Sequence, residues 1–270
     1  MPRFTTLTAV TRDDTDAFSL DIDPSSFIAR GPNGGYIAAV LLRALVARVD
    51  DLDGGASERP PRSLTVHYPA PPAAGPARIT TEVVRAGRSL VTCTAQLTQQ
   101  GKPMAVALAA FSRPWPDEAW NDRPAPEAPP PDALTYGGLE RPPLPFLDYW
   151  DHRFTMGRVV DTSGPAETQG WIRLAEPEPI DGPVVAAMTD AFPPAVFTRY
   201  PAPNPVPTVD LTVHFRAGLP LDGLEPDHFL LGHFRTRTVT EGFLEEDGEL
   251  WTADGMLLAQ SRQLAVMLPG

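Results

Sequence analysis

The sequence predicts an α+β protein made of two similar halves, each an antiparallel sheet wrapped around a central helix. Three observations lead to this prediction. A short strand-like motif occurs twice, a proline-rich stretch separates the two copies, and one segment is helix-forming and apolar around its whole circumference. With 270 residues, of which 42% are hydrophobic, the chain is long enough for one large domain or two domains of ordinary size.

The repeated motif is Leu-Thr-Val-His, at residues 64–67 and again at 211–214, a separation of 147 residues. An aromatic residue follows each copy, Tyr68 in the first and Phe215 in the second. A second match comes later in the same order, because the Thr-x-x-Gly turn ending at Gly101 returns 154 residues on. Two matches in the same order indicate a duplication with a small insertion.

Prolines divide the two halves. Ten of the 33 prolines lie between Pro114 and Pro145, and such a stretch carries neither a strand ladder nor a long helix. We therefore expect an N-terminal repeat over residues 1–112, a proline-rich linker over 113–148 and a C-terminal repeat over 149–270.

The first repeat shows both kinds of secondary structure. Apolar and polar residues alternate over 64–68 and 91–97, which predicts half-buried strands, and Gln100-Gly101 supplies a hairpin turn before the next strand. Residues 104–111 are apolar without a break, which predicts a central strand covered on both sides. The helix-forming segment 34–48 must be buried nearly all round, and a curved sheet wrapped about it provides that burial.

Charge and composition exclude several classes of protein. The chain has 22 Lys and Arg against 34 Asp and Glu, a net charge of −12, and no basic run, so we expect no nucleic-acid partner. Its longest apolar run, residues 36–42, is far shorter than the ~20 residues of a membrane span. The N-terminus lacks the apolar core of a signal peptide, and the single cysteine forms no internal disulfide, so we expect a cytoplasmic protein.

Several catalytic motifs are absent. There is no Gly-x-Ser-x-Gly elbow for a serine hydrolase, and neither glycine-rich nucleotide motif occurs. The five histidines and one cysteine have no metal-ligand spacing. We therefore expect neither a metal nor a bound cofactor.

At this point the chain resembles a known family, the acyl-CoA thioesterase II (TesB-like) proteins, whose fold is a tandem or double hotdog. The matching segments are Gly34-Gly35, residues 63–69, 85–89 and 100–103 in the first half, and residues 189–191, 208–216 and 258–263 in the second. The resemblance implies a thioester hydrolase of lipid metabolism that splits acyl-CoA into a free acid and coenzyme A, without a metal or cofactor.

The resemblance also implies a catalytic set. In that family an Asp, a Thr and a Gln of the second repeat act together, and here they correspond to Asp190, Thr208 and Gln263. Asp190 would take a proton from water as general base, while Thr208 and Gln263 orient that water. The departure from the family pattern lies just after Asp190, where Pro193 and Pro194 interrupt the expected helix.

Substrate-binding residues are expected at the start of the first helix. Backbone N–H groups of Gly34, Gly35 and Tyr36, with the helix dipole, would polarise the thioester carbonyl, although the second helix start is an alternative place for this. Arg88 would meet the phosphates of coenzyme A, and the alternative is a solvated arginine at a strand edge.

Each predicted site residue also has an ordinary structural interpretation. Asp190 could be a helix N-cap, Thr208 a strand-entry residue and Gln263 an exposed strand residue. The histidines of the two motif copies stand at polar-facing positions, which favours a structural role, and Cys93 is expected to be a buried, inert thiol.

Two other functions stay open on the sequence alone. One is a hotdog hydratase or dehydratase, disfavoured because no histidine closely follows Asp190, and the other is a non-catalytic acyl or acyl-CoA binding protein. A double hotdog already contains the pairing that single hotdogs reach by dimerising, so a monomer is physically reasonable. Sheet edges and helix faces often support further pairing, and we expect a homo-oligomer. The acyl chain and the choice between coenzyme A and a carrier protein are left open.

Overall fold

A computed structural model describes residues 3–28, 31–55, 58–115, 119–134, 144–157, 164–200 and 205–268. The helices are α1 (Phe4–Leu7), α2 (Gly34–Leu52) and α3 (Gly182–Met188), with short 3-10 helices η1 (Pro24–Ser26), η2 (Pro131–Ala133), η3 (Pro145–Tyr149) and η4 (Ala195–Thr198). The strands are β1 (Thr11–Asp14), β2 (Ala17–Ile22), β3 (Pro61–His67), β4 (Gly75–Ala86), β5 (Leu90–Gln99), β6 (Lys102–Ser112), β7 (Trp150–Met156), β8 (Glu167–Leu174), β9 (Thr208–Phe215), β10 (Leu230–Arg235), β11 (Val239–Thr240), β12 (Phe243–Trp251) and β13 (Leu257–Val266).

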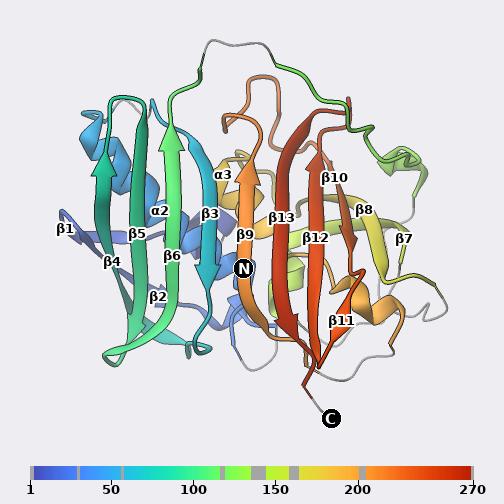
Figure 1. Ribbon diagram of the computed structural model, residues 1–270, viewed down its shortest axis with the longest axis horizontal. Coiled ribbons are helices and arrows are strands. Elements are labelled where there is room, and N and C mark those ends of the chain that lie inside the picture. Colours follow the sequence, from blue (N-terminus) through green and yellow to red (C-terminus); the bar gives the residue numbers. More distant parts are fainter. Residues whose placement is uncertain are drawn as a thin grey trace.

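The strands form one antiparallel sheet whose two halves repeat each other. Its order is β1-β2-β4-β5-β6-β3-β9-β13-β12-β10-β8-β7 (Figure 1). Counted outward from the centre, β3-β6-β5-β4-β2-β1 of the first half correspond one by one to β9-β13-β12-β10-β8-β7 of the second. The halves meet where β3 pairs with β9, and there Thr65 lies opposite Thr212 with their hydroxyl oxygens 3.0 Å apart. The predicted duplication and α+β class are confirmed, and the two expected sheets join edge to edge into one.

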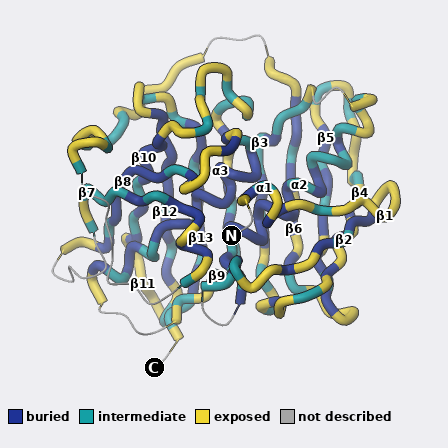
Figure 2. Tube along the Cα trace, turned by 180° about the vertical axis from the view of Figure 1, so that it is seen from behind, coloured by how far each residue is buried: buried dark blue, intermediate teal, exposed yellow. Residues whose placement is uncertain are grey.

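The helices cover the concave side of this sheet, α2 behind the first half and α3 near the junction (Figures 1 and 2). Asn33 caps α2, because its Oδ1 accepts the N–H of Tyr36 at 3.0 Å. Apolar residues on every side of α2, among them Val40 and Leu41, have no solvent exposure, which confirms the prediction of a helix buried nearly all round.

The second helix is much shorter than the first. Asp181 caps α3 by accepting the N–H of Val184 at 2.9 Å, and the helix ends at Met188, five residues before Pro193 and Pro194, which prevent it from continuing. Beyond its end, Phe192 fills the concave side of the second half, with its ring centre 4.8 Å from that of Phe234. Gly232 makes room for it, since a Cβ there would stand 2.6 Å from the Phe192 ring.

The strands of the first half follow their predicted alternation with one exception. Leu64, Val66 and Cys93 point inward and are fully buried. The unbroken apolar run of β6 predicted a strand covered on both sides, but Val106 and Leu108 are 36% and 51% exposed on the outer face. That prediction is wrong, because within the described residues the helices cover only the concave side of the sheet.

Residues 125–134 of the expected linker pack against the second half of the sheet. Trp171 Nε1 donates to the carbonyl of Pro129 at 2.8 Å, and Gln169 Nε2 donates to that of Glu127 at 2.9 Å. Ala125, Ala128 and Leu134 contact the same small apolar cluster around Trp171 and Trp251. The parts of the linker at 116–118 and 135–143 lie outside the described residues.

Candidate active site

The carboxylate of Asp190 lies at the junction of the two repeats. Asp190 follows the last residues of α3, yet its Oδ2 accepts the N–H of Gly35, at the start of the other repeat's helix, at 2.8 Å. The residue is therefore not the N-cap of α3 that its ordinary interpretation suggested, since that place belongs to Asp181. Instead it binds the positive end of α2, where two N–H groups and the helix dipole favour a negative charge.

Only glycine allows this approach. A Cβ on Gly34 would stand 2.9 Å from Asp190 Oδ2, and one on Gly35 would stand 2.6 Å from the carbonyl oxygen of Ala187 in α3. The start of α2 thus touches the end of α3 directly through the backbone. The Gly-Gly pair determines how closely Asp190 approaches the helix start.

Thr208 and Gln263 form a second pair within the site. Gln263 Nε2 donates to Thr208 Oγ1 at 2.5 Å, and the Gln263 side chain also hydrogen-bonds to the Asp190 carboxylate. Gln263 is 7% exposed, so its interpretation as an exposed strand residue is wrong. The structure therefore brings together all three residues of the expected catalytic set.

A β-bulge turns Thr208 toward this site. The register of β9 with β13 shifts by one residue between the pairs Leu264–Asp210 and Ala265–Thr208. Without this shift Thr208 would share the outer face with Asp210 and Thr212, because side chains alternate along a strand. Bulges next to active sites commonly redirect a side chain in this way.

The surroundings of Asp190 act on its pKa in opposite directions. Burial raises the pKa to about 6, while hydrogen bonds from Gly35, Asn33, Gly34 and Gln263 lower it. Burial is the larger effect. A carboxyl with this pKa is mostly ionised at neutral pH and still basic enough to accept a proton, which is what a general base requires.

Two further residues hold the site and were not predicted from the sequence. Asn33 Nδ2 donates to the backbone carbonyl of Asp190 at 2.8 Å, and Tyr68 Oη donates to the carbonyl of Gly34 at 2.9 Å. Each had a signal in the sequence. Asn33 precedes Gly-Gly at a helix start, where Asn is a preferred cap, and the first motif copy has a hydroxyl that Phe215 lacks in the second.

Tyr36 contributes to the site through its backbone. Its N–H completes the cap on Asn33, whereas its side chain is fully buried in the core and burial raises the pKa of the phenol. Its Oη has no hydrogen-bond partner within the described part of the chain.

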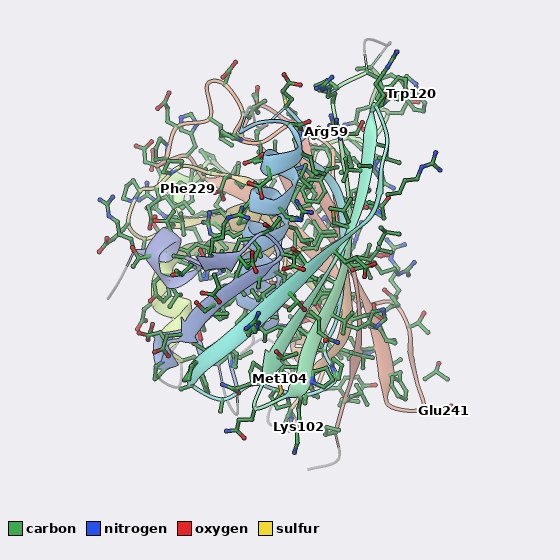
Figure 3. The ribbon with its side chains drawn as sticks, turned by 90° about the vertical axis from the view of Figure 1, so that its left-hand side faces the viewer. Arg59, Lys102, Met104, Trp120, Phe229 and Glu241 are labelled. Atoms are coloured by element: carbon green, nitrogen blue, oxygen red, sulfur yellow. The ribbon has the colours of Figure 1, made fainter. Side chains whose placement is uncertain are left out.

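Arg88 does not join the other predicted site residues. It is exposed in the turn between β4 and β5, where Arg59 donates to the neighbouring Gly87 carbonyl. Figure 3 shows Arg59 at one end of the sheet and Lys102 at the other. The end of β3, which leads to Tyr68 and the site, pairs toward the Lys102 end of β6. Arg88 and Asp190 thus lie at opposite ends of the strands.

The remaining candidate residues have structural positions. His67 and His214 are exposed on the outer face, as expected. Cys93 is buried, and burial raises the pKa of its thiol. Among the described residues, no group of three or more His, Cys, Asp or Glu side chains is placed to hold a metal ion. None of the helices described is both long enough and apolar enough to cross a membrane.

The fold and this site define a double hotdog protein with a buried carboxylate between its two repeats. Comparison with family models identifies both halves: residues 22–112 match the acyl-CoA thioesterase N-terminal domain, and residues 118–267 match the acyl-CoA thioesterase C-terminal domain. The chain belongs to the acyl-CoA thioesterase family, and it is a thioester hydrolase. Comparison with curated protein sequences gives no significant match.

Solved structures of similar proteins share the whole fold. A hot dog fold protein of unknown function from Alicyclobacillus acidocaldarius is 29% identical, with a TM-score of 0.88 over 99% of this chain and 98% of its own. A protein assigned as thioesterase II from Thermobifida fusca is 28% identical, with a TM-score of 0.84 over 100% and 98%. The acyl-CoA thioesterase II TesB2 from Mycobacterium marinum, 21% identical with a TM-score of 0.78 over 99% and 98%, shares the fold.

Proposed function

We propose that the chain hydrolyses acyl-CoA by direct attack of water, with Asp190 as general base and with Thr208 and Gln263 orienting the water. One observation carries this proposal: Asp190 is held by the N-terminus of α2 on one side and by Gln263, the partner of Thr208, on the other. A carboxylate, a hydroxyl and an amide are sufficient for thioester hydrolysis without a covalent intermediate.

The hydrogen-bond directions assign the roles. Gln263 Nε2 donates to Thr208 Oγ1, so the hydroxyl proton of Thr208 remains for the water. One proton of the water passes to Asp190 as the water oxygen bonds to the thioester carbon. The tetrahedral intermediate then collapses, the carbon–sulfur bond breaks, and the departing thiolate takes the proton back from Asp190.

The start of α2 serves both stages of this reaction. In the free chain its Gly35 N–H is occupied by Asp190, so it is not an empty site for the thioester carbonyl as sequence analysis expected. Once Asp190 accepts a proton, its charge is neutralised. The N–H groups and the dipole of α2 then act on the negative charge that develops on the thioester oxygen.

The symmetry of the fold supports one such site per chain. The helix caps Asn33 and Asp181 occupy equivalent positions in the two repeats, and so do Thr65 and Thr212. Counting from these pairs gives the residues of the first repeat that are equivalent to the catalytic set. They are Leu42 for Asp190, Pro61 for Thr208 and Ala109 for Gln263. The packing agrees, because a Cβ on Gly182 would meet Pro61 at 3.1 Å and Leu42 at 3.7 Å, as one on Gly34 meets Asp190. The equivalent position between the repeats is thus apolar and without a base.

A thiol-release assay tests the proposal. Coenzyme A liberated from acyl-CoAs of short to long chain, and from aryl thioesters, is measured with DTNB for the wild type, Asp190→Asn and the control Asp210→Asn. Asp210 lies two residues beyond Thr208, where the alternation of β9 directs it to the outer face. The only cysteine is buried with a raised pKa, so the chain itself contributes little to the signal.

We expect hydrolysis of at least one substrate, about 10²-fold or more slower in Asp190→Asn and unchanged in Asp210→Asn. Hydrolysis at the wild-type rate in Asp190→Asn would exclude Asp190 as the base. An acyl-CoA that raises the Tm without being hydrolysed would instead support the binding alternative.

The place of action and the assembly are part of the same proposal. A cytoplasmic enzyme agrees with a chain whose single cysteine is free and buried. A homo-oligomer agrees with the exposed Val106 and Leu108 on the outer face of the sheet. Light scattering of the purified chain would measure the assembly directly.

A further inference from the structure

We propose that Glu246 is a positioning residue of this hydrolase. Glu246 fixes the segment that follows Asp190 against β12, the strand that pairs with the strand of Gln263. The inference rests on the proposed roles of Asp190 and Gln263. Glu246 lies on β12 and is 8% exposed, on the inward face with Leu244, Gly248 and Leu250. Burying a carboxyl costs folding free energy unless hydrogen bonds compensate it, so its partners indicate what it does.

Glu246 contacts the segment that carries Asp190. Its Oε2 accepts the N–H of Ala195 at 2.6 Å. Ala195 is the first residue of η4 and comes five residues after Asp190, directly behind Pro193 and Pro194. Proline has no N–H to donate, so Ala195 provides the first backbone donor after the two prolines. The bond from Glu246 therefore anchors the chain as it leaves the site.

Glu246 is also the neighbour of Gln263. The two residues are directly opposite each other in the register of β12 with β13. Side chains so paired point to the same face, with Cβ atoms ~5 Å apart. One carboxyl thus lies beside Gln263 and holds the segment of Asp190, so it links two of the three proposed catalytic residues.

Comparison of the two repeats shows that Glu246 varies together with the site. Cys93 lies opposite Ala109 in the first repeat, as Glu246 lies opposite Gln263 in the second. Three apolar residues replace the catalytic set in the first repeat, and Cys93 now adds a fourth replacement at the position of Glu246. The carboxyl therefore belongs to the repeat that contains the base.

The charge state of Glu246 suits a positioning role. Burial, the charge of Asp190 and the charge of Glu245 raise its pKa to about 8, against the effect of the Ala195 N–H. The groups that face it from β13 and η4, Gln263 and the residues around Ala195, are uncharged. At neutral pH it is thus a neutral acid, which holds its neighbours without placing a second negative charge beside Asp190.

The test compares Glu246→Ala and Glu246→Gln with the control Asp247→Asn, which should leave kcat and its pH dependence unchanged. Asp247 is the following residue on the same strand, and its partly exposed carboxylate forms an ion pair with Arg262 at 3.3 Å on the other face. The measurements are kcat, KM and their pH dependence for one hydrolysed acyl-CoA, together with Tm.

We expect Glu246→Ala to lower kcat about 10- to 100-fold with KM within about threefold, because the base segment loses its anchor. Glu246→Gln keeps an acceptor for Ala195 and should retain kcat at pH 7 within about threefold. Wild-type kcat should fall as pH rises through about 8, where Glu246 gains its charge, and this alkaline limb should be absent in Glu246→Gln.

Two results would overturn the inference. One is a Glu246→Ala variant with wild-type kcat and only a lower Tm, which would make Glu246 purely structural. The other is a Glu246→Gln variant with the same alkaline limb as the wild type, a result that decides the matter even where Glu246→Ala does not fold. Asp190→Asn keeps the two proposals apart, because its activity tests the base and not the anchor.

Discussion

Replacing Gly35 by Ala sets two effects of opposite sign against each other. Within a helix, Ala is favoured over Gly by about 1 kcal/mol, so helix propensity alone predicts a more stable protein. The new Cβ, however, would stand 2.6 Å from the Ala187 carbonyl and 3.0 Å from Asp190 Cβ. Its nearest neighbour is a backbone carbonyl rather than the end of a flexible side chain, so one helix must move away from the other.

The size of that movement follows from the structure. Restoring ordinary contact at 3.4 Å requires a shift of about 3.4 − 2.6 = 0.8 Å between α2 and α3. Overpacking of this kind costs about 1–3 kcal/mol, which exceeds the gain from propensity. A displacement near 1 Å at a catalytic group lowers the rate about 10²-fold. We therefore expect Gly35→Ala to lose about 1 kcal/mol of unfolding free energy and about 10²-fold in kcat.

Urea unfolding and the thiol-release assay measure both effects. Gly34→Ala provides the comparison, because its Cβ meets the carboxylate oxygen of Asp190 at 2.9 Å and not a backbone atom. It should lose activity with a smaller loss of stability. Gly164→Ala, where a Cβ would meet nothing within 4 Å, should change neither. A Gly35→Ala protein that is more stable than the wild type and fully active would refute the reasoning.

Three further predictions concern the charge and the contacts of the site. The value of kcat/KM should rise with pH through about 6, where Asp190 ionises, and a profile flat from pH 5 to 7 would contradict Asp190 as the base. Folding raises the pKa of Asp190, so as the pH rises the unfolded chain releases this proton before the folded chain does. The free energy of unfolding therefore decreases as the pH rises from about 4 to about 6. Asp190→Asn should therefore be more stable than the wild type by about 3 kcal/mol in urea unfolding at pH 8, with the difference shrinking toward pH 4, and an equal or lower stability at pH 8 would count against this. Gln263→Leu should lower kcat about 10- to 100-fold with little change in KM, whereas Gln260→Leu, which removes an exposed acceptor of Arg216 from the outer face, should leave both unchanged.

The position of Asp190 illustrates how a site can be predicted in part. Its residue type and its place after an apolar helix could be taken from the sequence and from the family resemblance. Its function as a cap on the opposite helix could not, because that contact joins residues 155 positions apart. The same applies to Thr208, whose direction depends on a bulge in the pairing of two strands.

Arg88 illustrates a prediction that local pattern could not place. Its charge next to a strand suggested a partner for phosphate, but no local feature shows at which end of a sheet a turn lies. The strand register places it at the end opposite Asp190. The unbroken apolar run of β6 was misleading for a similar reason, since the pattern of one strand does not show whether a second layer covers its other face.

By itself the sequence determined what short-range physics controls. The alternation of apolar residues determined the strands, the all-apolar segment determined a buried helix, the prolines ended α3, and the repeated motif indicated a duplication. Only the tertiary structure decided how the repeats meet, which of two equivalent junctions holds the base, and that Glu246 lies opposite Gln263. These features depend on contacts between distant segments, whose close approach is set by packing across the whole sheet and not by any local stretch of residues.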